Sequence, residues 1–545
     1  MATANPTPEF QRILQTVCED FRGPWPLKPL QEETIKHLVE QRNDVFACLP
    51  TGYGKTEIYT LVPLVMERMR GKQCIMLVVS PLLSLMQDQV ERLQRRGISA
   101  AYIGETQKDP EIKRGVVEGK YSLVFASPEA LLNSKTWRGM LTSSTYREKL
   151  VAMTVDEAHC VTTWGKEFRK DYKRLAELRS LVADVPVLAL TATATEDIRK
   201  DILSSLCMEP DTYTVSKPSN RPNIMYHAIA ATYDMKKEFH WLLSELKDKG
   251  QSCSKVIIYC RNIKACSQMY KVFMNSLGDD GYNLEQDQTK SYKNRYVAMF
   301  HRSTANTNKN FVLEQFTKTD SIVRITIATI AFGMGIDVPD VYAVVHWGAP
   351  RNVEGFYQES GRAGRDGQPA HSLILHHSRT LAKGSCSPSM ASYCKLGNDS
   401  CRRKYLLDYF ALKSTIREEL SVEHTCCDSC GDSSTLPWHT NLASSEVSDE
   451  ELLKIAAIRQ PTSDQLNLLR ESLKDFRRDY MEEMGPTMYS FNVVTGFSLA
   501  TIDSIVECCA TLLTKDDIMT DIGLWDEEVV DMVFNILDET FQDNV

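Results

Sequence analysis

Short runs of β-branched and other apolar residues alternate with longer charged stretches of helical periodicity through the first 380 residues. The first group of runs is NDVFACL, CIMLVVS, SLVFAS, LVAMTVD and VPVLALTAT, and the second is KVIIYC, VRITIAT and YAVVHW. Such alternation is typical of an α/β fold, in which helices connect parallel strands. We therefore expect two parallel-sheet lobes in tandem, with ligands held by loops at the carboxyl ends of the strands.

The last 115 residues follow a different period. Leu466, Leu469, Leu473, Phe476 and Tyr480 are spaced three and four residues apart, which predicts one apolar face of a helix. The runs SIVECCATLL and EEVVDMVFNILDETF predict two more helices. The sequence thus predicts an all-α C-terminal region.

Charge separates the same two parts of the chain. The residues from Gly431 onward include 23 acidic and 7 basic side chains, a net charge of −16, so the first 430 residues carry +7 within the total of −9. A basic body is compatible with phosphate binding, although a charge surplus is often only a solvated surface. In the simpler interpretation the acidic region packs on itself or on the body; in the alternative its negative face masks a phosphate-binding track on the body or recruits a basic protein partner.

Nothing in the sequence predicts a membrane protein or a secreted one. No apolar run reaches the roughly 18 residues needed to cross a bilayer, and the N-terminus MATANPTPEF lacks the basic and hydrophobic segments of a secretion signal. Most of the 16 cysteines stand singly in apolar runs, where they are typical of small buried side chains. We expect an intracellular chain with no membrane partner, nuclear if its source is a eukaryote.

A nucleotide site is predicted where the run VFACL leads directly into PTGYGKT and a helical stretch. Glycines let backbone N–H groups wrap phosphates, Lys55 can neutralise the β- and γ-phosphates of ATP, and Thr56 can ligate Mg²⁺. Leu49 stands where the general pattern begins with glycine, and the alternative is a glycine-rich turn without nucleotide. The expected ligands in this loop are Thr51, Gly52, Gly54, Lys55 and Thr56.

The apolar run at residues 150–155 ends in the tetrad DEAH. After a strand and downstream of a phosphate loop, Asp156 can hold Mg²⁺ through water, and Glu157 can polarise the water that attacks the γ-phosphate. Alone, the tetrad would indicate only a helix start on the surface. In this position it predicts the catalytic carboxylates of an ATPase.

These segments resemble those of RecQ helicases over about the first 430 residues. LKPLQ with Gln31 resembles the family's adenine-contacting segment, VVSPLLSLMQDQV with Ser80 and FASPE resemble its DNA-contacting loops, and TATAT resembles the block that couples hydrolysis to DNA. The resemblance implies two RecA-like lobes, ATP hydrolysis with Mg²⁺, 3′-to-5′ movement on single-stranded DNA and duplex unwinding. No residue pattern by itself predicts that direction.

The stretch DEAHCVTTWGKEFRKDY resembles the RecQ aromatic-rich loop, which implies that it senses single-stranded DNA and relays this to the ATP site. Aromatic faces stack on any base at about 1–3 kcal/mol each, and interleaved cations meet phosphates. Alternatively, Trp164 and Phe168, four residues apart, form one buried helical face. The expected DNA-binding residues here are Trp164, Phe168, Arg169 and Tyr172.

The second group of strands is followed by QESGRAGRDG, which carries Arg362 and Arg365 three residues apart. Positive charge supplied from a second lobe stabilises phosphoryl transfer, and an arginine finger is worth about 10³–10⁵ in rate. The block resembles motif VI of the family, which implies finger and γ-phosphate-sensing roles for the pair, without saying which has which, and a nucleotide contact for Gln358. In the alternative, the arginines cap a helix or pair with Glu359.

By the same resemblance, Arg261 and Asn262 after VIIYC match motif IV and contact DNA, while motif V links the nucleotide cleft to the DNA track. The motif V residues are Gly333, Gly335 and Asp337. Four positions depart from the family pattern, and the last two lack a positive charge that the family usually has: Lys28, Lys166, Val338 and Tyr342. Residues 278–296 are a polar insertion, expected as a surface loop.

A zinc site is predicted in the cysteine-rich segment, because four thiolates fit tetrahedral coordination and the last two have the usual two-residue gap. The set resembles the zinc module of the Werner-type RecQ branch, and a closed shell implies a structural role. His424 or Cys394 as substitute ligand, and cysteines without metal, remain open. Arg402 and Arg403 are expected to face DNA or a neighbouring lobe. The four expected ligands are Cys401, Cys426, Cys427 and Cys430.

Together these patterns predict four domains: residues 1–215 as an ATP-binding RecA-like lobe, 216–385 as a second RecA-like lobe, 386–432 as the zinc module and 433–545 as an acidic helical region. The expected activity is that of an ATP-dependent DNA helicase in repair or recombination, with ATP, Mg²⁺ and Zn²⁺ as cofactors and single-stranded and duplex DNA as partners. Alternatives are a DNA-stimulated translocase or annealing factor, favoured by the lack of a winged-helix pattern, an RNA helicase, and a scaffold that binds DNA without turnover.

Overall fold

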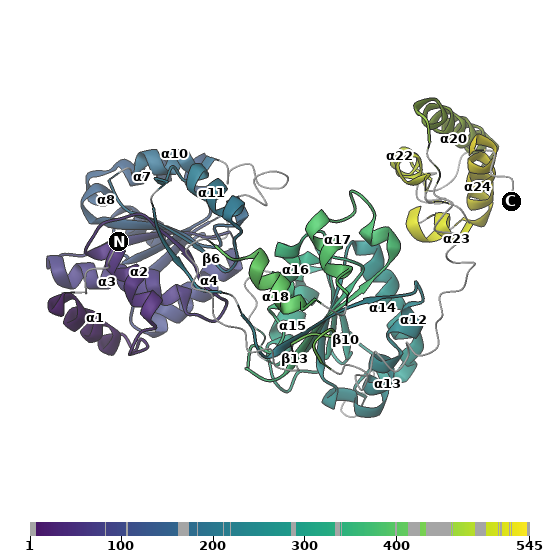
Figure 1. Cartoon of the computed structure of the whole chain (residues 1–545). Coiled ribbons are helices and arrows are strands. Elements are labelled where there is room, and N and C mark those ends of the chain that lie inside the picture. The colour runs from purple at the N-terminus through teal and green to yellow at the C-terminus, as the bar shows by residue number, and fades with distance from the viewer. Residues whose placement is uncertain are drawn as a thin grey trace. The chain divides into compact units, whose positions relative to one another are not determined.

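The described part of the chain forms two compact units, Met1–Asn441 and Leu442–Val545 (Figure 1). No helix in it is both long and apolar enough to span a bilayer. The computed structural model describes all residues except 1–6, 82, 105–106, 162–173, 183, 211, 219, 285–289, 333–337, 339, 398–399, 413–425, 432–458, 460, 485–496, 511, 513–514, 523, 525 and 542–545.

The first lobe is built on a seven-stranded sheet with the order β3-β4-β2-β5-β6-β1-β7, in which all neighbours are parallel. Every residue of β1, β2 and β5 is buried, which explains why these central strands appear in the sequence as continuous apolar runs. The first predicted lobe is therefore confirmed. The strands are β1 Val45–Cys48, β2 Ile75–Val79, β3 Ala100–Ile103, β4 Leu123–Ala126, β5 Leu150–Val155, β6 Val187–Thr191 and β7 Tyr213–Ser216.

Helices cover both faces of this sheet (Figure 1). Successive side chains of a strand point to opposite faces, so Val45 and Ala47 join the core beneath α1–α3, whereas Phe46 and Cys48 join the core beneath α7, α8 and α10. The helices are α1 Pro8–Asp20, α2 Pro29–Val39, α3 Lys55–Arg70, α4 Leu83–Arg95, α5 Pro110–Val117, α6 Pro128–Asn133, α7 Lys135–Thr142, α8 Ser144–Lys149, α10 Leu175–Leu181 and α11 Glu196–Ser205.

The second lobe has a six-stranded sheet with the order β10-β11-β9-β12-β13-β8, again parallel throughout. Its strands are β8 Ile224–Ala230, β9 Lys255–Cys260, β10 Val297–Phe300, β11 Ile325–Ala328, β12 Val341–Trp347 and β13 Ala370–His376. Its helices and 3₁₀ turns are α12 Met235–Glu238, α13 His240–Lys249, η2 Gly250–Ser252, α14 Ile263–Leu277, η3 Gly278–Gly281, α15 Asn306–Phe316, η4 Ile330–Phe332, α16 Val353–Ser360 and η5 Ser378–Leu381. The polar insertion begins with η3, and a bridge between Tyr282 and Arg295 closes it.

The described residues of the cysteine-rich segment share their core with the second lobe. Helices α17 Pro388–Cys394 and α18 Arg402–Tyr409 contribute Met390, Tyr393 and Leu406 to the apolar cluster on one face of the second sheet. The ring of Tyr393 lies 5.1 Å from that of Phe356, on α16. The segment is therefore packed as an extension of the second lobe.

The second unit is helical in its described residues, as predicted. Leu469 and Leu473 are fully buried, and Leu466, Phe476 and Tyr480 pack against the same core, so the expected apolar face of α20 is confirmed. Val529, Val533 and Leu537 from the last helix complete that core. The elements are α20 Ser463–Met484, α22 Leu499–Cys508, α23 Lys515–Asp517, the π-helical turn η7 Ile518–Ile522 and α24 Glu527–Phe541.

Candidate active site

The predicted phosphate loop joins the end of β1 to the start of α3, at the carboxyl edge of the first sheet. Gly52 and Gly54 have φ values of +78° and +87°, in the left-handed region that favours glycine, and Gly54 caps α3. The helix N-terminus that follows provides N–H groups and a positive dipole for an anion. The Lys55 ammonium donates to the carbonyl of Leu49, 3.1 Å away, and therefore folds back over the loop.

The predicted adenine segment contacts the phosphate loop directly. The buried side-chain amide of Gln31 donates to the carbonyls of Tyr53 and Gly54 at 3.1 and 2.9 Å, and accepts from the Lys28 N–H at 2.9 Å. The Lys28 ammonium donates to the carbonyls of Gly52 and Tyr53 and lies 4.7 Å from the centre of the Tyr53 ring. Lys28, one of the four positions that depart from the family pattern, therefore stabilises the phosphate loop.

The carboxylates of the DEAH tetrad follow β5 at the same edge of the sheet. Burial, together with the negative charge of Glu157, raises the pKa of Asp156 to about 7, while Lys55 acts in the opposite direction. Glu157 has a φ of +50°, and its N–H donates to the Asp156 carboxylate at 3.0 Å. This turn holds a half-buried acid beside the Lys55 loop and places a second carboxylate next to it.

A series of polar contacts leads away from Glu157. Its carboxylate lies 3.4 Å from His159 Nδ1, which is 3.2 Å from the hydroxyl of Thr191 at the end of β6. The Thr191 hydroxyl donates to the carbonyl of Thr193, and the Thr193 hydroxyl accepts from the Gln358 amide at 3.3 Å. Burial lowers the pKa of His159, which favours the neutral ring at this junction. The contacts thus connect the tetrad through TATAT to α16 of the second lobe.

The two arginines lie on the turn that follows α16. Arg362 is buried and hydrogen bonds to the Tyr259 side chain, whereas Arg365 is partly exposed. Burial raises the pKa of Tyr259, so this phenol stays neutral beside the guanidinium. Glu359, the alternative partner considered from the sequence, instead lies 2.8 Å from His346 Nε2.

Two residues that the sequence did not single out hold this turn. Arg221 donates to the carbonyls of Gly361, Ala363 and Gly364 at 2.8–3.0 Å, and Asn223 donates to those of Gly364 and Gln368, both at 2.8 Å. Their only sequence signal is their place in the polar NRPN segment directly before β8. We refer to residues 361–368 as the arginine turn.

The expected DNA-binding residues have different surroundings. Ser80 follows β2 with a side chain 2% exposed, and its hydroxyl has no hydrogen-bond partner among the described residues. Arg261 donates to the Ser385 carbonyl, and Asn262 caps α14 by accepting from the Ala265 N–H at 2.8 Å. The following expected residues lie outside the described part: Trp164, Lys166, Phe168, Arg169, Tyr172, Gly333, Gly335 and Asp337.

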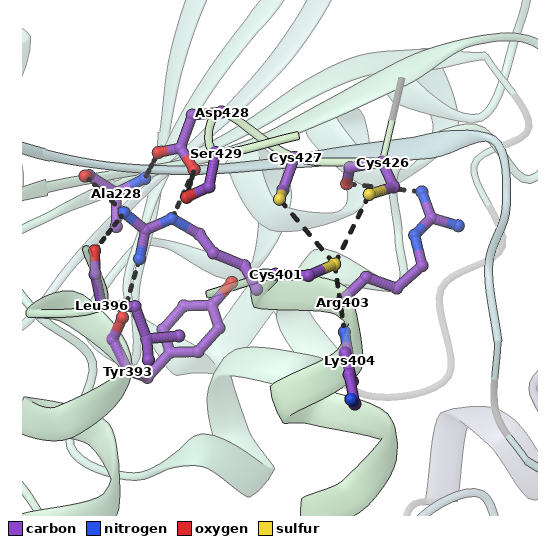
Figure 2. A network of polar contacts seen from close by, with 11 residues as sticks. Ala228, Tyr393, Leu396, Cys401, Arg403, Lys404, Cys426, Cys427, Asp428 and Ser429 are labelled. Carbon is purple, nitrogen blue, oxygen red and sulfur yellow. Dashed lines mark hydrogen bonds and ion pairs between the residues drawn. The ribbon is translucent and has the colours of Figure 1, made fainter. Parts of the chain in front are cut away.

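The four predicted zinc ligands come together. The sulfur atoms of Cys401, Cys426, Cys427 and Cys430 all lie within 4.8 Å of one another (Figure 2). The Cys401 sulfur is 3.5 Å from that of Cys426 and 4.0 Å from that of Cys427. Tetrahedral zinc with bonds of about 2.3 Å places its sulfurs roughly 3.8 Å apart, so the cluster fits that ion. Cys394 is not in this cluster, and His424 lies outside the described residues.

Hydrogen bonding favours a thiolate at Cys401. Burial alone raises the pKa of this thiol, but the Lys404 N–H and the other three cysteines lower it below its usual value. Burial raises the pKa of Cys426 to about 11, so a cation is needed before all four sulfurs can be thiolates together.

Arg402 and Arg403 face a neighbouring lobe, which is the second of the two alternatives expected for them. Both are buried, with 4% and 6% exposure, and both bond to the second lobe. Arg402 pairs with Asp428 at 2.6 Å, and Arg403 donates to backbone carbonyls of residues 221–224. The adjacent pair starts a helix that is packed against the second lobe, so neither side chain reaches the surface.

Comparisons with known proteins agree with this geometry. The family model DEAD/DEAH box helicase matches residues 28–201, and the model Helicase conserved C-terminal domain matches residues 237–367. A relative from Caenorhabditis briggsae named "Putative ATP-dependent DNA helicase Q1" is 31% identical over 488 residues, which cover 84% of this chain and 73% of the relative.

Other relatives are longer than this chain. The ATP-dependent DNA helicase Q5 of Rattus norvegicus is 35% identical, over 77% of this chain and 42% of the relative. The RecQ-like DNA helicase BLM of Xenopus laevis is 33% identical, over 71% of this chain and 28% of the relative. The chain therefore spans less than half the length of these two proteins.

Solved structures show the same fold at low sequence identity. The DEAD-box helicase Mss116 bound to single-stranded RNA and UDP-BeF matches with a TM-score of 0.55 and 16% identity, over 97% of this chain and 95% of that one. The helicase MrfA bound to DNA and AMPPNP matches with a TM-score of 0.54 and 15% identity, over 74% and 54%. Two RecA-like lobes with these sequence relatives identify the chain as a member of the RecQ family of helicases.

Proposed function

We propose that this chain is an ATP-dependent DNA helicase that hydrolyses ATP when single-stranded DNA is bound, moves 3′ to 5′ and separates duplexes during repair or recombination of nuclear DNA. The observation that carries the proposal is the line of polar contacts from Glu157 through His159, Thr191 and Thr193 to Gln358. It joins the Glu157 carboxylate of one lobe to α16 of the other, the helix that directly precedes the arginine turn. Such a connection suits an ATPase whose turnover depends on the arrangement of two lobes.

The residues divide the chemistry among them. Lys55 exchanges its bond to Leu49 for the phosphates of ATP, and Thr56 with Asp156 would hold Mg²⁺ at the loop. The ion neutralises phosphate charge when it is bound. Glu157 accepts a proton from the attacking water, and Arg362 with Arg365 stabilises the charge that develops on the transferred group. Which arginine is the finger depends on the closed arrangement of the lobes.

DNA would be bound by residues around the carboxyl edges of the two sheets. Ser80 offers a buried hydroxyl after β2, and Arg261 follows β9. The aromatic-rich loop with Trp164, Phe168, Arg169 and Tyr172 would stack on bases and report their presence to the neighbouring tetrad. Asn262 is the weakest member of the proposed set because its side chain already caps a helix.

The cysteine cluster would hold one structural Zn²⁺. Four thiolate ligands complete a tetrahedral shell and leave no position for substrate. Support comes from the sulfur distances and from the lowered pKa of Cys401. We also propose the limits 1–215 and 216–385 for the two lobes, because the first sheet ends with β7 at Ser216 and the second begins with β8 at Ile224. Residues 386–432 are then a zinc module packed on the second lobe, and residues 433–545 are the acidic helical region.

Hydrolysis assays with and without single-stranded DNA test the proposal, beside unwinding of forked duplexes with a 3′ or a 5′ tail. We expect Lys55→Ala to abolish all turnover, because the phosphates lose their cation, and Trp164→Ala to abolish only the stimulation by DNA. DNA binding without hydrolysis would show a scaffold and overturn the proposal. Hydrolysis without unwinding would show a translocase or annealing factor, and stronger stimulation by RNA would show an RNA helicase.

A further inference from the structure

The arginine turn is held from outside by one guanidinium. Arg221 bonds three carbonyls that flank Arg362 and precede Arg365, at 2.8–3.0 Å. Gly364 has a φ of +55°, and a Cβ at this position would lie 2.4 Å from the Asn223 amide. Backbone conformation in the turn therefore depends on close contact with residues 220–224, the segment directly before β8.

That segment is itself held by the cysteine-rich part of the chain. Arg403 donates to the carbonyls of Arg221, Pro222 and Ile224 at 3.0, 3.1 and 2.8 Å, and to the Asn220 side chain at 3.3 Å. It also donates to the carbonyl of Cys426 at 3.4 Å. Arg403 stands two residues after Cys401 and lies beside Cys426 in Figure 2.

The other end of the cluster is attached to the same strand. Asp428 accepts from the Ala228 N–H at 3.0 Å (Figure 2). It also pairs with Arg402, and the backbone of Cys427 forms an isolated β-bridge with that of Tyr226. Residues in and beside the four-cysteine cluster thus contact β8 at Tyr226 and Ala228, and they also contact the segment before β8. Hydrogen bonds therefore connect the cluster to the segment that supports the arginine turn.

We infer that Arg221 is a positioning residue for the arginine turn, and that Arg403 relays the order of the cysteine cluster to it. This inference rests on the proposed ATP hydrolysis. A guanidinium presents five N–H donors in a planar fork and can bond several carbonyls at once, whereas a lysine ammonium at the same place cannot span them all. If the Arg221 hydrogen bonds are lost, Arg362 and Arg365 keep their charge, but their guanidinium groups are no longer held in position for the transferred phosphoryl group.

The test compares Arg221→Lys, Arg403→Lys and the double variant in the full chain. The matched control is Arg324→Lys: Arg324 is also a buried arginine that bonds loop carbonyls, but it stands before β11, which lies three strands away from β13, the strand that follows the arginine turn. The readouts are kcat and KM for ATP, zinc content and melting temperature. A further readout is the affinity ratio, which is the affinity for ADP with aluminium fluoride divided by the affinity for ADP alone. The last ratio reports recognition of the transferring group and does not change with stability alone.

For Arg221→Lys we expect kcat and the affinity ratio to fall together by about ten- to a hundredfold, with KM within about twofold, as for an interaction made only in the transition state. Arg403→Lys should show a smaller fall of the same kind at full zinc content. The double variant should match Arg221→Lys, because both act through one path. Asn223→Ala, which removes two bonds to the same turn, should lower the ratio even if Arg221→Lys folds poorly.

Three results would overturn the inference: an unchanged ratio in both Arg221→Lys and Asn223→Ala, an equal fall in Arg324→Lys, or additive effects in the double variant. If the unmodified chain hydrolyses ATP and the variants have the same kcat and affinity ratio as that chain, the inference is wrong but the proposed function is not affected. A chain without hydrolysis removes both.

Discussion

Gly364 shows how closely the arginine turn depends on single residues. Its Cβ, if present, would lie 2.4 Å from the Asn223 amide, 2.7 Å from the Gln368 carbonyl and 2.9 Å from the Ala370 Cβ. Gly367, three residues later in the same turn, also has a positive φ, of +83°, but no described atom lies within 4 Å of the place its Cβ would take. The two glycines separate backbone strain from steric exclusion.

We therefore expect Gly364→Ala to lower the free energy of unfolding by about 2–4 kcal/mol, the sum of left-handed strain and overpacking, and to lower ATP hydrolysis strongly. Gly367→Ala should cost only the strain, about 1 kcal/mol, and leave hydrolysis nearly intact. Thermal melting and steady-state hydrolysis measure both effects. Equal loss in the two variants would mean that contact with Asn223 does not matter.

The sequence predicted the placement of residues correctly where local pattern and chemistry coincide, whereas their catalytic and metal-binding roles stay predictions. Lys55, Asp156 and the four cysteines were predicted because each follows a strand or has a spacing that its chemistry requires. Arg221 and Asn223 were missed because their partners are backbone carbonyls about 140 residues away, which leave no trace in the sequence around either residue. Arg403 was only half understood, since two adjacent arginines resemble a surface patch until the burial of α18 is known.

Among the elements, the cysteine-rich segment should depend on its metal. Cys427 is fully buried within the cluster, so we expect Cys427→Ser to abolish zinc binding and lower stability by several kcal/mol. Cys394, also buried but not in the cluster, is the control, and Cys394→Ala should keep one zinc per chain. Metal analysis and thermal melting measure the outcome. Full zinc content in Cys427→Ser would contradict the proposed ligand set.

Strand β13 should make the first unit sensitive to acid. Burial lowers the pKa of His371 from 6.5 to about 4, and its ring nitrogen lies 3.3 Å from that of His227. The unfolded chain therefore takes up a proton at higher pH than the folded chain, and the free energy of unfolding should fall as pH drops from about 6.5 toward 4. His371→Gln should show a shallower fall in melting temperature over this range, whereas His240→Gln, at an exposed position on α13, should follow the unmodified chain.

At the scale of the whole molecule, the two compact units differ sharply in charge. The unit Leu442–Val545 contains 22 acidic and 7 basic side chains, a net charge of −15, whereas the remainder is basic. Its helices were predictable from their apolar period because they form a small core of their own. The role of this unit was not predictable, because an acidic surface is compatible with packing on itself, with masking of a DNA-binding surface and with binding of a protein partner.

Repulsion between this unit and DNA should weaken binding when salt is low. We expect deletion of residues 442–545 to raise affinity for single-stranded DNA at low ionic strength, with the difference vanishing as the screening length falls below about 10 Å near 0.1 M salt. Hydrolysis without DNA should stay unchanged and serves as the control. Equal affinity of both forms at every salt concentration would leave the acidic unit with no electrostatic role.

The shared interior of the second lobe and the cysteine-rich segment limits how far the molecule can be shortened. Tyr393 packs on Phe356, and Phe410 lies 5.0 Å from Tyr357, so the helix leading into the arginine turn rests on side chains that come after the last strand. A chain that ended at His376 would contain every strand of both sheets, but the aromatic face of α16 would be exposed to water. A shortened chain that keeps α16 covered must therefore extend at least to Phe410.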